Sequence, residues 1–307
     1  MTCDPGVDDA VALAVAAGRA DGAVRAVVAG AGNVDAETAW RNAAGLARLL
    51  GLDVPVAMGS GTTVDGRPIR RAPGAHGADG LAGLSNRLTA PAGDRAPALV
   101  PGGRRTGSVA AVPGEGLVTG YVIATGPLTD VALALRDGRA VDRVVWMGGS
   151  FAPAAGDAAP AGGEFNAGVD PAAVELVLGA PVDLAIVPIE VTRRVALDGD
   201  VLARWSFGPP VARLCADLAA RRPHHGGGPV VLHDPVAVVA ALEPGRFRWD
   251  RRPLRCARGA GAGRGVLVPA GPLHSDAGTW PAIAVAVDAA AVRRRIVEAV
   301  LAAGPAT

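Results

Sequence analysis

Short apolar runs recur along the chain, and each of them ends on a glycine or a polar residue. Their content of valine and isoleucine is typical of strands that are buried on both faces. The runs cover residues 23–32, 54–59, 117–126, 143–149 and 182–191, and stretches of helical length at 36–50, 128–136 and 171–178 alternate with them. This alternation predicts an α/β fold with an open, mostly parallel, Rossmann-like central sheet flanked by helices, in a single domain over residues 1–307.

The residues that follow the apolar runs are the first candidates for function. In an open parallel sheet, ligands bind beyond the carboxyl ends of the strands. The candidates at these positions are Asp4, Asn33, Thr125, residues 147–149 and Glu190. We therefore expect a binding site along one edge of the sheet.

The chain opens with Cys-Asp-Pro-Gly-Val-Asp-Asp-Ala, which places three carboxylates within six residues. A Pro-Gly turn would leave Asp4 at a strand end and bring Asp8 and Asp9 to the start of a helix over residues 11–17, where the helix dipole favours anions. Clustered carboxylate oxygens are the ligands that Ca²⁺ and Mg²⁺ prefer. The alternative is an aspartate that caps the helix beside solvated carboxylates.

Composition removes several classes of function. Hydrophobic residues make up 50% of the 307 and charged residues 19%, and the net charge of +1 gives no electrostatic case for nucleic acid or an anionic membrane. All thirty basic residues are arginine, which excludes chemistry that needs a Walker, Schiff-base or kinase lysine. Three widely spaced cysteines favour neither a disulfide framework nor a zinc site. The arginine pair at 221–222 is interpreted as solvated surface.

The opening motif resembles the signature of the inosine–uridine-preferring nucleoside hydrolases. Further blocks follow in the order that this family has, and together they extend to about residue 302. They are Ala-Gly-Asn at 31–33, Arg-Asn-Ala at 41–43, His-Gly-Ala-Asp-Gly-Leu at 76–81, Thr-Gly-Pro-Leu-Thr at 125–129, Met-Gly-Gly at 147–149, Gly-Glu-Phe-Asn at 163–166 and Leu-His-Asp-Pro at 232–235. The resemblance implies a nucleoside-hydrolase fold and hydrolysis of the N-glycosidic bond of ribonucleosides.

The same resemblance implies roles for individual residues. It implies a Ca²⁺ site formed by Asp4, Asp9, the Thr125 carbonyl and Asp234. Two residues are implied to be catalytic: Asp4, which also takes a proton from the attacking water, and His233, which lies beside the leaving base and supplies a proton or a hydrogen bond. Binding of substrate is implied for Asp8, Asn33, His76, Asp157, Glu164 and Asn166. It further implies a cytoplasmic homodimer or homotetramer whose partner is a small nucleoside, with no nucleic acid or membrane bound.

Taken one at a time, these residues have ordinary structural explanations. His76 could be a loop histidine, His233 a helix-entry residue and Glu164 a solvated charge, while the two asparagines could cap helices or turns.

Three departures from the family pattern keep a second function open. Only three residues precede Asp4, so we expect a short, truncated first strand; Asp157 stands where the family has asparagine; and prolines and glycines interrupt residues 101–116, where the alternation predicts a helix. The loop before His233 has no tyrosine, which leaves the base specificity open. The rival hypothesis is a non-catalytic homologue that binds Ca²⁺ or a pentose. An aspartyl-phosphate phosphotransferase is disfavoured, because that mechanism needs a lysine.

Overall fold

The computed structural model describes residues 1–18, 24–69, 71, 73–88, 120–151, 163–222, 229–259, 261, 263–270 and 280–305. Asp157 lies outside these residues. So do residues 101–116 and most of residues 153–163 and 223–229.

An eight-stranded sheet forms the centre of the molecule, in the order β10-β13-β7-β5-β4-β1-β2-β3. All neighbouring pairs are parallel except β10 with β13. The strands are β1 (Thr2–Cys3), β2 (Val27–Ala29), β3 (Val56–Met58), β4 (Gly120–Ala124), β5 (Val141–Met147), β7 (Asp183–Val187), β10 (Phe247–Arg251) and β13 (Ala282–Val287). The mostly parallel α/β sheet is therefore confirmed, including the short first strand with Asp4 directly after it.

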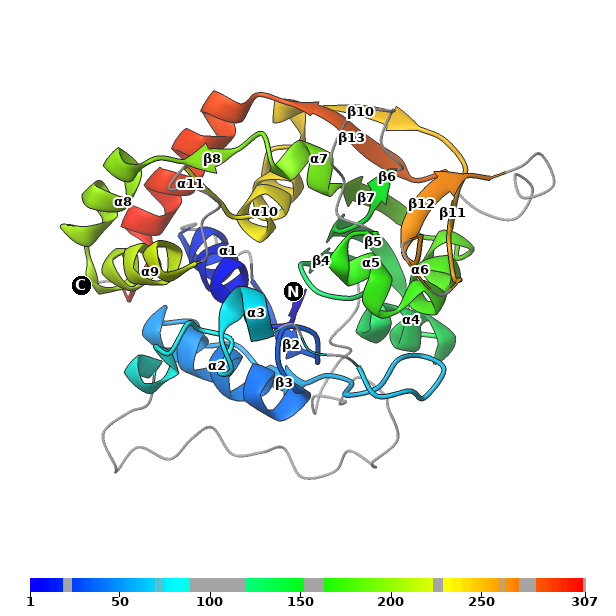
Figure 1. The fold of residues 1–307 in the computed structure, drawn as a ribbon, viewed down its shortest axis with the longest axis horizontal. Helices are drawn as coiled ribbons and strands as arrows, with labels where there is room; N and C mark the ends of the chain where they lie inside the picture. The colour runs from blue at the N-terminus through cyan, green and yellow to red at the C-terminus, as the bar shows by residue number, and fades with distance from the viewer. Residues whose placement is uncertain are drawn as a thin grey trace.

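Helices cover both faces of this sheet (Figure 1). One side carries α1 (Val7–Ala17), α9 (Pro210–Arg221), α10 (Asp234–Leu242) and α11 (Ala289–Ala302), and the other carries α4 (Thr129–Arg136) and α6 (Pro171–Leu178). The remaining helices are α2 (Ala36–Leu49), α3 (Pro73–His76), α5 (Phe165–Val169), α7 (Ile189–Thr192), α8 (Gly199–Ser206), η1 (Ser85–Leu88) and η2 (Pro244–Arg246). No helix in the described part of the chain is long and apolar enough to cross a membrane.

Two minor sheets complete the fold. One contains β11 (Leu254–Cys256), β12 (Val266–Pro269) and β6 (Ser150–Phe151), and the other pairs β8 (Ala196–Leu197) with β9 (Val230–Val231). The first packs through β11 against α6.

Alternation along the central strands separates two hydrophobic cores. In β5, Val145 belongs to the core beneath α1, and Trp146 belongs to the core beneath α4 and α6. Ala185 and Ile186 divide in the same way in β7. Strands with apolar residues at every position are expected when helices cover both faces.

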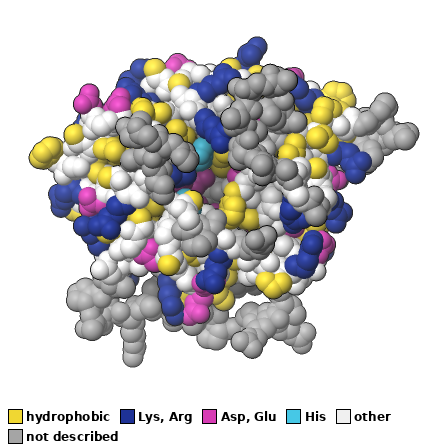
Figure 2. Space-filling model, viewed as in Figure 1, with side chains coloured by type: hydrophobic (Ala, Val, Ile, Leu, Met, Phe, Trp, Pro, Cys, Tyr) yellow, Lys and Arg dark blue, Asp and Glu magenta, His cyan; other side chains and the backbone are white. Residues whose placement is uncertain are grey.

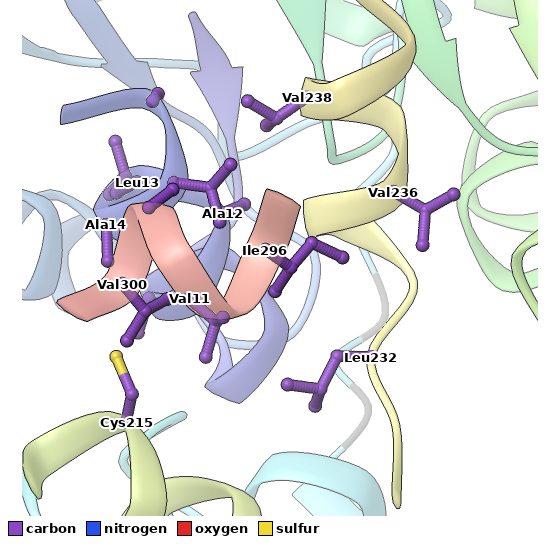
Figure 3. Close-up of a cluster of buried hydrophobic side chains, with 14 of the residues drawn as sticks. Val11, Ala12, Leu13, Ala14, Cys215, Leu232, Val236, Val238, Ile296 and Val300 are labelled. Atoms are coloured by element: carbon purple, nitrogen blue, oxygen red, sulfur yellow. The ribbon is translucent and has the colours of Figure 1, made fainter. Parts of the chain in front are cut away.

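Helix α1 is held on all sides, because its residues from Val7 to Ala16 are buried. Figure 3 shows its apolar side chains meeting those of three helices that come much later in the sequence. The labelled partners are Cys215 of α9, Val238 of α10, and Ile296 and Val300 of α11. The helix that carries Asp8 and Asp9 is thus fixed by packing from the C-terminal third of the chain.

A buried carboxylate near the site makes stability depend on pH. Asp130, in α4, is 5% exposed and accepts a hydrogen bond from the Ser60 amide at 2.8 Å, and burial raises its pKa to about 6. The native state therefore binds the proton more tightly than the unfolded chain, where aspartate titrates at about 3.9. Because the native state binds more protons between these values, the free energy of unfolding from this group falls as pH rises from about 4 to about 6.

We predict that Asp130→Asn raises the free energy of unfolding at pH 7.5 by about 1–3 kcal/mol, because asparagine carries no buried charge. At pH 4.5, where native Asp130 is already protonated, the variant and wild type should differ much less. Urea unfolding at both pH values measures this. The same difference at both would show that ionisation of Asp130 is not involved.

Candidate active site

The predicted candidates converge at the carboxyl ends of the central strands. Asp4 directly follows β1, Thr125 directly follows β4, and Asn33 lies in the turn after β2. Glu164 begins α5, which follows β6 in the chain. At the middle of the face shown in Figure 2, histidine and acidic side chains are visible between arginines.

Asn33 joins two of the three aspartates of the opening motif. Its backbone amide donates to Asp4 Oδ2 at 2.8 Å, and its side-chain Nδ2 lies 3.0 Å from the Asp4 carbonyl oxygen and 3.3 Å from Asp9 Oδ2. Asp9 Oδ2 also accepts from the Gly6 amide at 3.0 Å. The motif therefore folds as a turn and a helix start whose carboxylates point back to the strand ends.

Thr125 and Asn166 extend this network across the sheet. The Thr125 hydroxyl donates to Asp9 Oδ1 at 2.7 Å, while its carbonyl accepts from Asn166 Nδ2 at 2.9 Å. Asn166 Nδ2 also donates to the Met147 carbonyl at 3.0 Å. The side-chain oxygen of Asn166, Oδ1, takes no part in these bonds. It is therefore able to accept a hydrogen bond from a sugar hydroxyl.

Glu164 is buried, which excludes its reading as a solvated charge. It caps α5: Oε1 accepts from the Asn166 amide at 2.8 Å, and Oε2 accepts from the amides of Gly149 at 2.8 Å and Ala167 at 3.1 Å. Burial raises the pKa of Glu164, although these three amides oppose the rise. The carboxylate is therefore held in one orientation by the backbone around it.

Asp8, His233 and Asp234 form the other half of the site. The His233 amide donates to Asp8 Oδ2 at 2.8 Å, although the two residues are far apart in the sequence. Asp234 starts α10 beside His233. Burial, and then the negative charges of Asp9 and Asp4, hold the pKa of Asp234 well above its usual range. The opening motif and the late His-Asp-Pro block thus share one site.

The ring of His233 is held by Thr192. The Thr192 hydroxyl lies 2.7 Å from His233 Nδ1, a hydrogen-bond distance, and 3.1 Å from the Ile189 carbonyl oxygen. Burial first, and then the charge of Arg222, lower the pKa of His233 to about 3. Near neutral pH the ring is therefore neutral, with one ring nitrogen a donor and the other an acceptor.

Arg222 corrects one expectation from the sequence. Its neighbour Arg221 is exposed, but the side chain of Arg222 is only 16% exposed and its Nη1 contacts Asp8 Oδ1. Burial lowers the pKa of Arg222, and the charge of Asp234 opposes this. The solvated-surface interpretation is thus wrong for Arg222, because the end of α9 directs it into the carboxylate cluster.

His76 stands at the start of α1. Its Nδ1 accepts a hydrogen bond from the Val7 amide at 3.1 Å, and burial lowers its pKa. It therefore fixes the turn next to Asp8 and is 7% exposed. Glu190, another strand-end candidate, accepts from the Phe151 amide at 2.9 Å, and its other oxygen has no hydrogen-bond partner among the described residues.

The oxygen atoms at the centre suit a hard divalent cation. Asp4 Oδ1 is buried and has no hydrogen-bond partner among the described residues. Burial, followed by the charge of Asp9, holds the pKa of Asp4 well above its usual range, which is the electrostatic condition that a cation would relieve. As it stands, however, the described part of the chain contains no group of three or more His, Cys, Asp or Glu side chains placed to hold a metal ion.

The match to known proteins covers almost the whole chain. Residues 1–294 match the family model for inosine-uridine preferring nucleoside hydrolase. The chain belongs to this family. The family resemblance expected from the sequence is thus confirmed, and this nucleoside hydrolase cleaves ribonucleosides to free base and ribose. The family is metal-dependent in general.

Curated relatives support the same assignment. The enzyme is 34% identical over 259 residues to the pyrimidine-specific ribonucleoside hydrolase RihA of Photobacterium profundum, covering 80% of each chain. It is 32% identical over 273 residues to uridine nucleosidase 1 of Arabidopsis thaliana, covering 82% of this chain and 76% of the relative.

Solved structures confirm the fold. A plant nucleoside hydrolase, PpNRh1, superposes with a TM-score of 0.77 at 24% identity over 98% of both chains. A purine-preferring ribonucleoside hydrolase from Gardnerella vaginalis has a TM-score of 0.75 at 22% identity, over 98% of this chain and 99% of its own.

Close approach of a glycine to Asp4 gives a test of the site geometry. A Cβ at Gly32 would lie 2.0 Å from Asp4 Oδ2 and 2.7 Å from its Cγ, so the carboxylate would have to move. We predict that Gly32→Ala folds but lowers kcat on ribonucleosides by about 10²-fold, the cost of a misplacement of about 1 Å.

Gly61→Ala is the matched control, because its Cβ would meet only the Ala36 side chain, at 3.9 Å. Steady-state kinetics of both variants, with circular dichroism for folding, makes the comparison. Normal turnover by Gly32→Ala would contradict the position that the structure gives to Asp4.

Proposed function

We propose that this enzyme is a Ca²⁺-dependent N-ribosyl hydrolase of ribonucleosides, in which Asp4 takes a proton from the attacking water. The observation that carries this proposal is the buried Asp4 Oδ1, which has no hydrogen-bond partner among the described residues and whose carboxyl interacts electrostatically with Asp9 and Asp234. A bound Ca²⁺ would supply Lewis acidity that orients a water molecule and lowers its pKa. The residues that would hold it are Asp4, Asp9, Asp234 and Thr125.

The ribose would be held by side chains that the backbone has already fixed. Asp8 and Glu164 accept hydrogen bonds from sugar hydroxyls, and the amide groups of Asn33 and Asn166 can accept in the same way through their oxygens. Cleavage of the glycosidic bond passes through an oxocarbenium-like transition state, which buried carboxylates stabilise. Binding energy on the ribose is thereby used for orientation.

His233 is proposed to lie beside the leaving base and to form a hydrogen bond with it. Thr192 holds the ring in one orientation. His76 is proposed to line the substrate side through its position beside Asp8. Asp157, outside the described residues, is proposed to bind substrate where the family has asparagine.

Pyrimidine ribonucleosides are the substrates that we propose. The support is the printed specificity of the curated relatives, one a pyrimidine-specific hydrolase and another a uridine nucleosidase. We also propose that residues 1–307 form one domain that works in the cytoplasm as a homodimer or homotetramer. The three cysteines are unpaired, as a reducing compartment would leave them, and Phe207, 92% exposed, offers an apolar contact.

We predict that the enzyme releases uracil from uridine more rapidly than hypoxanthine from inosine, and that a chelator abolishes both reactions. Ca²⁺ added in excess should restore them, because the buried carboxylates need a cation. Chromatography of free base and a reducing-sugar assay give the rates. Binding of ribose without turnover of any nucleoside would instead identify the non-catalytic homologue.

Asp4→Asn and Asp9→Asn separate proton transfer from cation binding. Both remove a charge from the site, but only Asp4 is proposed to accept the water's proton. We predict that Asp4→Asn lowers kcat by about 10²–10⁴-fold at every Ca²⁺ concentration, whereas excess Ca²⁺ largely restores Asp9→Asn.

Calcium binding to each variant is measured by calorimetry, so that loss of the cation is seen directly. Equal restoration of both variants by Ca²⁺ would reduce Asp4 to a ligand without a role in proton transfer.

A further inference from the structure

Arg222 is a partly buried cation to which the steps above give no role. It follows α9, and its side chain is 16% exposed while that of its partner Asp8 is 4% exposed. Guanidinium has five N–H donors in a rigid planar fork. The contact to Asp8 uses Nη1, and this side chain forms no other hydrogen bond or ion pair with the described residues. Donors therefore remain for a ligand.

The position of Arg222 is defined by the carboxylate that it shares with His233. Asp8 Oδ1 contacts Arg222, and Asp8 Oδ2 accepts from the His233 amide at 2.8 Å. The charge of Asp234 also acts on Arg222. Asp8, the proposed ribose-binding carboxylate, therefore lies between Arg222 and the backbone of His233, the residue proposed to meet the leaving base.

The chemistry of a pyrimidine nucleoside matches this position. The base is attached to C1′, next to the carbon that bears the 2′-hydroxyl, and carbonyl oxygen O2 lies beside the N1 atom of the broken bond. When the C1′–N1 bond breaks, its electron pair stays on the base, and the negative charge spreads over N1, O2 and O4. The water oxygen bonds to C1′ and its proton passes to Asp4. The base anion then takes a proton from solvent to give neutral uracil.

We propose that Arg222 is a catalytic residue that donates to O2 of the departing pyrimidine and stabilises the negative charge on the base as the bond breaks. This proposal rests on the proposed nucleoside hydrolysis. A preorganised cation in a site that excludes water stabilises developing charge strongly, and loss of one such donor costs about 10²–10³-fold in kcat. It also favours bases with a carbonyl next to the glycosidic nitrogen.

Arg222→Gln is the test, since glutamine keeps a donor but removes the charge. Its substrates are uridine, 5-fluorouridine, whose base is a better leaving group, and p-nitrophenyl riboside, which has no pyrimidine O2. We expect kcat to fall by about 10²–10³-fold with uridine, by less with 5-fluorouridine, and by less than about threefold with p-nitrophenyl riboside. Arg221→Gln, at the exposed neighbour that donates to the Ala82 carbonyl at 3.3 Å, is the matched control and should behave as wild type.

A binding measurement gives a second readout that does not need turnover. 5-Nitrouracil is largely anionic at neutral pH, so its Kd should rise about tenfold in Arg222→Gln, while the Kd of neutral uracil should change little. Arg222→Lys, which keeps the charge, should retain most of the affinity for 5-nitrouracil and serves if the glutamine variant fails to fold.

The outcomes distinguish this inference from the proposed function. Equal losses on all three substrates, with unchanged binding of 5-nitrouracil, would overturn it and leave Arg222 as a positioning residue for Asp8. Full activity of Arg222→Gln on uridine would overturn it outright. Absence of turnover by the wild type on every substrate would refute the proposed hydrolysis, and the role of Arg222 would fall with it.

Discussion

The burial of several carboxylates at one edge of the sheet is the constraint on which the rest of the site depends. Asp4, Asp8, Asp9, Asp234 and Glu164 are each at most 5% exposed. Charges removed from water are stable only when they are paired or hydrogen-bonded. Each neighbour in this site therefore has an electrostatic function as well as a structural one.

Three kinds of partner compensate the buried charges. Backbone amides donate hydrogen bonds to Glu164 and Asp8, the side chains of Asn33 and Thr125 donate to Asp9, and a guanidinium pairs with Asp8. Asp4 and Asp234 are compensated least, and their pKa values are raised well above the usual range. The divalent cation that we propose between them would be a fourth kind of partner, in agreement with the metal dependence of the family.

Packing converts this electrostatic arrangement into a rigid geometry. Helix α1, buried against α9, α10 and α11, fixes two carboxylates, and Asp4 lies so close to Gly32 and Gly126 that neither position has room for a Cβ. The helices that hold α1 also carry Arg222 and Asp234 at their ends. The packing that forms the core therefore also brings the site residues together. Substitutions in this core should accordingly affect both stability and turnover.

Local sequence signals were sufficient where the chemistry is local. Helix α6 begins and ends at the predicted residues, since proline at a helix start, an aspartate cap and apolar spacing act within a few residues. The opening motif likewise predicted Asp4 at a strand end and Asp8 and Asp9 in the first helical turn. The strand ends had already pointed to Asn33 and Thr125, and the family resemblance added Glu164 and Asn166. The structure brings these four residues into one hydrogen-bonded network.

Tertiary structure alone decided which charges meet. Nothing near Arg222 in the sequence distinguishes it from the exposed Arg221, because its burial depends on where α9 ends relative to Asp8 at the other end of the chain. The hydrogen bond of Thr192 to His233, and the pKa of about 3 that burial gives to that ring, are likewise set by neighbours from distant segments. Sequence determined which functional groups are available at the strand ends. Desolvation and charge pairing, which exist only in the folded chain, determined the pKa values and the partners of those groups.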